Sequence, residues 1–214
     1  MFRQVLILAT AAPALVFSSA GAPVRPLAAE VLIEGGQVYD GSGDPALAFD
    51  VAIEGNRIVY IGPHRDGAVQ AERVIDAKGM IVVPGFIDPH THADADLQSD
   101  DPGRRANPAY LYQGVTTVVI GNDGGGSAAV AETATALEES GIGTNVGLLV
   151  GFGTVRSAIV GEDDRAPTES ELAAMKRQVA SGICEGALGF STGLHYTPQA
   201  FATTTEVASL AAEA

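Results

Sequence analysis

Two histidines separated by one residue carry the clearest chemical signal in this sequence. His90 and His92 come shortly after an apolar run, residues 82–87, that is rich in the residues of a strand buried on both faces. Residues i and i+2 of an extended backbone point to the same side, so the two imidazoles can reach one metal ion. The spacing therefore predicts a metal site, and the alternative is a pair of polar loop residues.

The chain after Pro84 alternates strands with helices, which is typical of βαβ units and a parallel sheet. Histidines at the carboxyl end of such a strand lie where barrel enzymes keep their chemistry. Thr168 with Glu171, and Thr203 with Glu206, have the spacing of helix capping boxes. We expect strands at 82–88, 115–121, 145–151 and 186–191, and helices around 106–113, 127–140, 169–181 and from 204 onward.

The preceding segment, residues 30–83, predicts a small β domain. Short β segments are expected at 31–34, 37–39, 49–54 and 57–61. Gly35-Gly36 separates the first two segments, and Gly55-Asn56, a pair that tolerates positive φ, predicts a hairpin between the last two.

Residues 1–22 have the pattern of a secretory signal peptide. Arg3 gives a basic start, residues 5–17 are mostly apolar, and small residues at 18–22 suit cleavage, which could fall as late as residue 29. The apolar run is shorter than the roughly 20 residues needed to span a bilayer, so export is favoured over a retained anchor. We expect a periplasmic or secreted bacterial protein.

The composition favours a soluble enzyme that acts on small molecules. A net charge of −14 argues against nucleic acid and against an anionic membrane surface as partners, and an apolar content of 46% allows a sizeable core. Cys184 is the single cysteine, so no internal disulfide can form.

The run Pro-Gly-Phe-Ile-Asp-Pro-His-Thr-His at 84–92 resembles the metal-binding motif of the amidohydrolase superfamily. Residues 113–119, 121–124 and 185–194 are similar to the N-acyl-D-amino-acid deacylase (D-aminoacylase) family within it. The resemblance covers the chain from about residue 30 onward.

This resemblance implies an α/β fold in which a small β-sandwich domain precedes a TIM-like (β/α)8 metal-dependent hydrolase barrel. A full barrel takes about 250 residues, more than follow Pro84. We therefore expect about four βα units at 84–214, the first half of the barrel, in the amino-terminal part of a longer protein.

The resemblance also implies hydrolysis of the amide bond of N-acyl-D-amino acids by metal-activated water, with one or two metals that are usually zinc. His90 and His92 would be metal ligands. Asp123 is a third candidate, although the family commonly has cysteine there, and an oxygen donor makes the site more permissive of other divalent metals. The alternative for Asp123 is a plain turn residue.

Three further residues are candidates for the site. Tyr196 matches the tyrosine of the family's Gly-Leu-x-Tyr and would bind the scissile carbonyl, unless it is a core tyrosine. Arg156 could bind a substrate carboxylate or pair with the acidic run at 162–164. Asp88 either orients a metal ligand or hydrogen-bonds backbone amides around Pro89.

Two alternative functions remain open. A cyclic amidohydrolase of the dihydroorotase or hydantoinase kind would carry a carbamylated lysine on the fourth strand, and no lysine stands at 180–214, which favours the deacylase. Hydrolysis of another amide or a dipeptide is the related possibility. An interpretation from another class is an inactive truncated fragment that lacks the later metal ligands and leaves strand edges open.

Overall fold

The computed structural model describes residues 25–214, so the predicted signal peptide at 1–22 lies outside the described residues. The chain divides into two compact units, one that ends at Pro84 and one that begins at Gly85. Among residues 25–214, no helix combines the length and apolar character required to span a bilayer.

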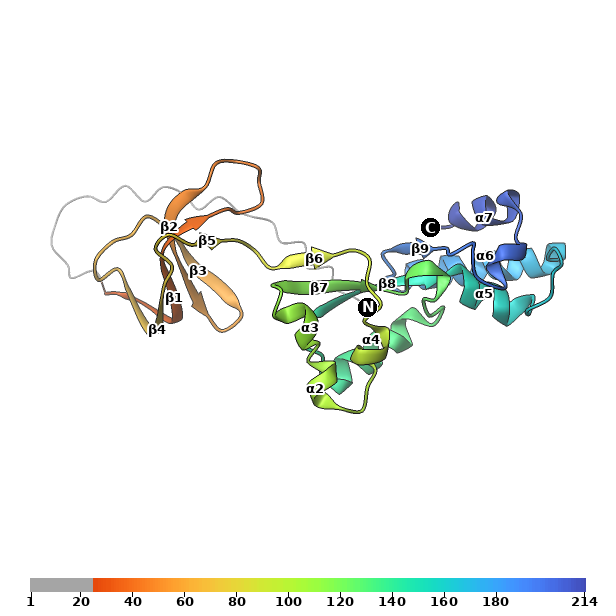
Figure 1. The fold of residues 1–214 in the computed structure, drawn as a ribbon, viewed down its shortest axis with the longest axis horizontal. Helices are drawn as coiled ribbons and strands as arrows, with labels where there is room; N and C mark the ends of the chain where they lie inside the picture. The colour runs from red at the N-terminus through yellow and green to blue at the C-terminus, as the bar shows by residue number, and fades with distance from the viewer. Residues whose placement is uncertain (1–24) are drawn as a thin grey trace. The chain divides into compact units, whose positions relative to one another are not determined.

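The amino-terminal unit is a mixed sheet with the strand order β3-β2-β1-β4, and β5 pairs with β1. β1 is antiparallel to β2 and parallel to β4 and β5, and the expected hairpin is formed by β2 and β3. Its small core contains Ala29, Leu32 and Ala52. The strands are β1 (Leu27–Val38), β2 (Leu47–Glu54), β3 (Arg57–Gly62), β4 (Val69–Asp76) and β5 (Ile81–Val82) (Figure 1).

Two details of this unit differ from the prediction. The pair Gly35-Gly36 does not separate two strands: β1 runs through it, and the register with β2 shifts between Ile33 and Gly36. The strand expected at 82–88 is divided, because Ile81–Val82 pairs with β1 while Phe86–Asp88 pairs with β7. Pro84 lies between the two pieces and has no N–H with which to continue a ladder.

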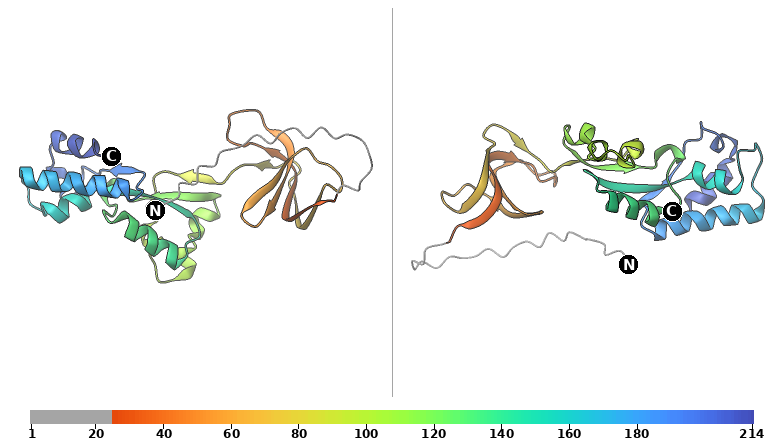
Figure 2. Two further views of the ribbon diagram at one scale, coloured as in Figure 1. Left: turned by 180° about the vertical axis from the view of Figure 1, so that it is seen from behind. Right: turned by 90° about the horizontal axis from the view of Figure 1, so that it is seen from below.

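The second unit is built on a parallel sheet with the strand order β6-β7-β8-β9. Helices α4 and α6 both pack against β8 (Figures 1 and 2). The strands are β6 (Phe86–Asp88), β7 (Val115–Ile120), β8 (Asn145–Gly151) and β9 (Gly189–Ser191). The helices are α1 (Asp94–Leu97), α2 (Pro102–Arg105), α3 (Pro108–Leu111), α4 (Val130–Ser140), α5 (Phe152–Ile159), α6 (Glu169–Cys184) and α7 (Thr204–Ala211), with short 3-10 turns η1 (Asn122–Gly124) and η2 (Gln199–Phe201).

The two expected capping boxes have different outcomes. At α6 the Thr168 hydroxyl accepts from the Glu171 amide, and the Glu171 carboxylate accepts from the Thr168 amide, so this box is complete. At α7 the Thr203 hydroxyl accepts from the Glu206 amide. The Glu206 carboxylate, however, binds Arg156 of α5, because the two side chains share a buried position.

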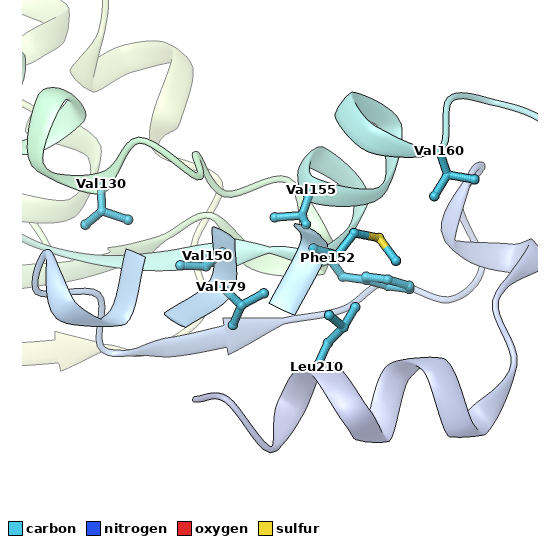
Figure 3. Close-up of a cluster of buried hydrophobic side chains, with 8 residues drawn as sticks. Val130, Val150, Phe152, Val155, Val160, Val179 and Leu210 are labelled. Atoms are coloured by element: carbon cyan, nitrogen blue, oxygen red, sulfur yellow. The ribbon is translucent and has the colours of Figure 1, made fainter. Parts of the chain in front are cut away.

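The main core of this unit surrounds the carboxyl end of β8 (Figure 3). It includes Phe152, the first residue of α5, and α5 is a helix that the sequence did not predict. Phe152 is fully buried, and its ring lies beside that of Phe190 at a centroid distance of 5.9 Å. The buried members are Val130, Val150, Phe152, Val155, Val160, Met175, Val179 and Leu210. This packing fixes the end of β8 next to the loops that follow β7 and β9.

Candidate metal centre

The candidate ligands lie at the carboxyl ends of two adjacent strands. His90 and His92 follow β6, and Asp123 follows β7, whose Val118 is paired with Asp88 of β6. Because neighbouring parallel strands end at the same edge of a sheet, residues 90 and 92 meet residue 123 there.

Thr91, between the two histidines, fastens their loop to β7. Its side chain is buried, its hydroxyl donates to the Val119 carbonyl at 2.8 Å, and its amide donates to the same oxygen at 3.1 Å. Asn122 adds two bonds from its side-chain amide, to the carbonyls of Thr91 at 3.1 Å and Val119 at 3.0 Å. With Thr91 directed inward, His90 and His92 are both left exposed. Thr91 was not among the predicted site residues. Its position between two histidines that point to the same side would have predicted that its own side chain points the other way, into the protein.

The three side chains converge closely enough for one metal ion. The Nε2 of His90 lies 3.8 Å from Asp123 Oδ1, and the Nε2 of His92 lies 3.3 Å from Asp123 Oδ2. One ligand atom from each residue falls within 4.8 Å of the others. Two donors of a tetrahedral zinc ion, each about 2.0–2.2 Å from the metal, are about 3.3–3.6 Å apart. Two imidazoles and a carboxylate in this arrangement therefore fit a divalent cation.

Asp123 is both a turn residue and a member of this cluster. Its φ of 55° and ψ of 25° place it in the left-handed region, which Asp and Asn tolerate better than other side chains do. That conformation directs its carboxylate toward the two imidazoles. The two predicted roles of Asp123 are thus compatible in one conformation.

Asp88 takes the backbone role that the sequence analysis allowed. Its Oδ1 accepts a hydrogen bond from the His90 amide at 3.1 Å. This bond spans the turn at Pro89 and fixes the backbone of His90 just after the end of β6. It does not involve the imidazole nitrogens.

Tyr196 lies next to the candidate ligands. A cavity of about 700 Å³ is lined by Tyr196 together with His92 and Asp123, and α5 contributes Thr154 to its wall. Tyr196 is 55% exposed, so it is not the core tyrosine of the alternative. The residue is therefore accessible on the wall of this cavity.

Arg156 is not available to a substrate in this structure. Its side chain has no exposed surface, its Nε donates to Glu206 Oε1 at 3.0 Å, and an Nη donates to the Arg165 carbonyl at 2.7 Å. The predicted substrate-binding role is therefore replaced by a buried ion pair between α5 and α7. The partner is also different from the predicted acidic run at 162–164.

The family comparison agrees with the motif. The model of the amidohydrolase family matches residues 73–214, so the chain belongs to the amidohydrolase family.

Within that family the chain is similar to deacylases of N-acyl-D-amino acids. It is 36% identical to the D-aminoacylase of Alcaligenes xylosoxydans xylosoxydans, over 83% of this chain and 40% of that protein. A D-aminoacylase structure solved to study its binuclear metal centre matches with a TM-score of 0.75 and 32% identity, over 85% of this chain and 42% of that one.

A structure of N-acyl-D-glutamate deacylase from Bordetella bronchiseptica, in complex with zinc and a phosphonate mimic of the tetrahedral intermediate, matches similarly. Its TM-score is 0.74 at 36% identity, over 87% of this chain and 43% of that one. The chain thus spans about 40% of the length of these relatives.

Proposed function

We propose that this protein hydrolyses the amide bond of N-acyl-D-amino acids and releases a carboxylic acid and a D-amino acid. The observation that carries the proposal is the convergence of His90, His92 and Asp123 at one edge of the sheet, in a chain similar to D-aminoacylases. The cavity beside them has a volume of about 700 Å³, which suits a small-molecule substrate.

His90, His92 and Asp123 would hold one divalent metal, and remaining ligands for it or for a second ion would come from elsewhere in the protein. Such a metal supplies a Lewis acid for the amide carbonyl and activates a water molecule. We propose zinc, which the related Bordetella bronchiseptica enzyme binds. The Asp123 carboxylate is a harder donor than a thiolate and would also accept other divalent metals.

Tyr196 is the proposed substrate-binding residue. Its hydroxyl can donate to the scissile carbonyl, and a donor positioned for the developing oxyanion stabilises the transition state more than the substrate. The exposure of Tyr196 on the wall of the same cavity as His92 supports this role.

We further propose that β6 to β9 are the first half of a (β/α)8 barrel at 84–214, and that residues 30–83 are part of a β-sandwich domain. The parallel order of the four strands supports the first assignment. Ile87 lies on the edge strand β6, and Leu188 directly precedes the other edge strand, β9. Their exposed fractions are 67% and 69%, as expected of a sheet that further strands would cover. The 214-residue chain by itself would then have little activity. The signal-like pattern at 1–22 supports a periplasmic or secreted location.

The test is metal content and N-acyl-D-amino-acid hydrolysis of the protein expressed from its complete reading frame. The wild type should carry stoichiometric metal and hydrolyse the substrate, and the double variant His90→Ala, His92→Ala should lose both. Metal without hydrolysis of any N-acyl-D-amino acid would assign another amide substrate, the cyclic amides of the alternative included. Absence of both from the wild type would overturn the proposal.

A further inference from the structure

The loop that carries Asp123 is held by side chains from a distant part of the chain. The Ser191 hydroxyl, at the end of β9, donates to the Gly121 carbonyl and accepts from the Gly124 amide at 3.1 Å. The Gln199 side chain donates from Nε2 to the Asp123 carbonyl at 2.9 Å. Three backbone groups within four residues are thus fixed by two side chains.

Gln199 is itself tightly positioned. It is 3% exposed, and its Oε1 accepts a hydrogen bond from the Gly193 amide at 2.7 Å. Its carboxamide fits between Gly124 and Gly153: a methyl group added at Gly124 would collide with Oε1, and one added at Gly153 would lie 2.8 Å from Nε2. Both ends of the amide are used, so its orientation is determined.

The Asp123 backbone is the part of the candidate centre that needs such support. Its left-handed conformation is uncommon for a residue with a side chain, and it persists where surrounding contacts determine it. If the Asp123 carbonyl turned, the carboxylate would move away from the imidazoles that it faces at 3.3 and 3.8 Å. Gln199 bonds to that carbonyl and contacts no candidate ligand atom in the bonds described.

We propose that Gln199, assisted by Ser191, is a positioning residue that sets the metal affinity of the centre by holding Asp123 in its left-handed conformation. This inference rests on the proposed metal-dependent function. Loss of an outer hydrogen-bond partner of a metal ligand typically weakens metal binding about 10- to 100-fold.

The variant that tests this is Gln199→Glu, in the protein expressed from its complete reading frame. Glutamate keeps the shape and can still accept from the Gly193 amide, but it places an oxygen against the Asp123 carbonyl in place of a donor. Asn107→Asp is the matched control. Asn107 is 1% exposed, has a φ of 54°, and donates to Thr144, which is not part of the centre.

Zinc affinity is measured by competition with a chromophoric chelator, and thermal unfolding of the metal-free proteins is measured in parallel. We expect zinc affinity to fall about 10- to 100-fold in Gln199→Glu and to stay within about twofold of wild type in Asn107→Asp. Equal zinc affinity in wild type and Gln199→Glu would overturn the role of Gln199 alone, and so would an equal loss in the control. A wild type that binds no zinc would overturn the metal-dependent function as well.

Ser191→Ala keeps the inference testable if Gln199→Glu does not fold. This smaller change removes the bonds to the Gly121 carbonyl and the Gly124 amide and leaves Gln199 in place. Zinc affinity about tenfold weaker, with a thermal unfolding curve close to that of the control, supports the positioning role. Unchanged affinity contradicts it.

Discussion

The His90, His92 and Asp123 cluster and the Arg156–Glu206 pair lie in the same unit, but their side chains differ in exposure. The side chains of the two histidines are 60% and 66% exposed, and that of Asp123 is 34% exposed. Arg156 and Glu206 are 0% and 3% exposed and are 3.0 Å apart. Nitrogen-bearing side chains face a carboxylate in both places, yet of these two places only the first is open to a ligand.

This difference separates polar groups that serve the fold from those that can serve chemistry. A buried ion pair is retained because loss of one partner leaves an unpaired charge in a medium of low polarity. An exposed group of three donors contributes little to folding, since solvent screens its charges. The convergence of exposed side chains with metal-ligating atoms on one point is therefore the more informative sign of a binding site.

His64, in the amino-terminal unit, shows the contrast for a single residue type. Its Nδ1 lies 2.8 Å from Asp50 Oδ2 and its Nε2 lies 3.0 Å from Asp66 Oδ1. Hydrogen bonds to Asp50 and then Asp66 raise the pKa of His64 above its ordinary value. Both ring nitrogens of His64 are thus occupied by carboxylates of the protein, whereas His90 and His92 share one carboxylate at longer distances.

The largest effect should come from Asp123→Asn in the exposed cluster. Asparagine tolerates the left-handed conformation, so the turn is kept while the charged donor is lost. On the proposed deacylase activity, we expect kcat/KM for an N-acyl-D-amino acid to fall about a thousandfold in the protein expressed from its complete reading frame, because metal-assisted stabilisation of the transition state is worth several kcal/mol. Thermal unfolding of the metal-free protein should change little. A large loss of thermal stability with full activity would reverse the assignment of the two regions.

The buried pair should show the opposite pattern. Arg156→Met leaves Glu206 buried without a partner, and we expect the free energy of unfolding to fall by about 3–5 kcal/mol in urea titrations. Arg156→Met combined with Glu206→Leu should recover most of that loss, since no buried charge remains. Zinc affinity of the folded single variant should match wild type. A cost below about 1 kcal/mol, or additive costs in the double variant, would show that the pair is not a structural unit.

Local patterns predicted much of the fold and brought attention to the three residues of the candidate centre. Strand β7 before Asp123, the complete capping box at Thr168, and the convergence of His90 and His92 follow from residue spacing, although the strand predicted at 82–88 is divided. Such features depend on neighbours within a few residues, and hydrophobic periodicity and capping chemistry report them directly.

Contacts between residues distant in the chain could not be predicted in this way. Arg156 is paired with a residue 50 positions away, and Gln199 bonds to Asp123 across 76 positions. The acidic run at 162–164 is closer to Arg156 in the sequence than Glu206 is. In the folded chain, however, Arg156 of α5 pairs with Glu206 of α7. Helix α5 was missed because its first residues, Phe152 and Gly153, continue the apolar and glycine pattern of β8.

The smallest effect concerns His64, and it sharpens the contrast between occupied and open histidines. Because the pKa of His64 is raised in the folded state by Asp50 and Asp66, with Glu34 also nearby, the protonated ring stabilises the amino-terminal unit. That contribution is fully present below the unfolded-state pKa of about 6.5 and is lost as the pH rises through the higher folded-state value. Thermal unfolding followed from pH 6 to 9 should show a decrease of a few degrees at most in wild type and a flatter profile in His64→Gln. A profile unchanged by the substitution would mean that solvent screens the three carboxylates, and that occupied ring nitrogens alone do not distinguish a structural histidine from a ligand.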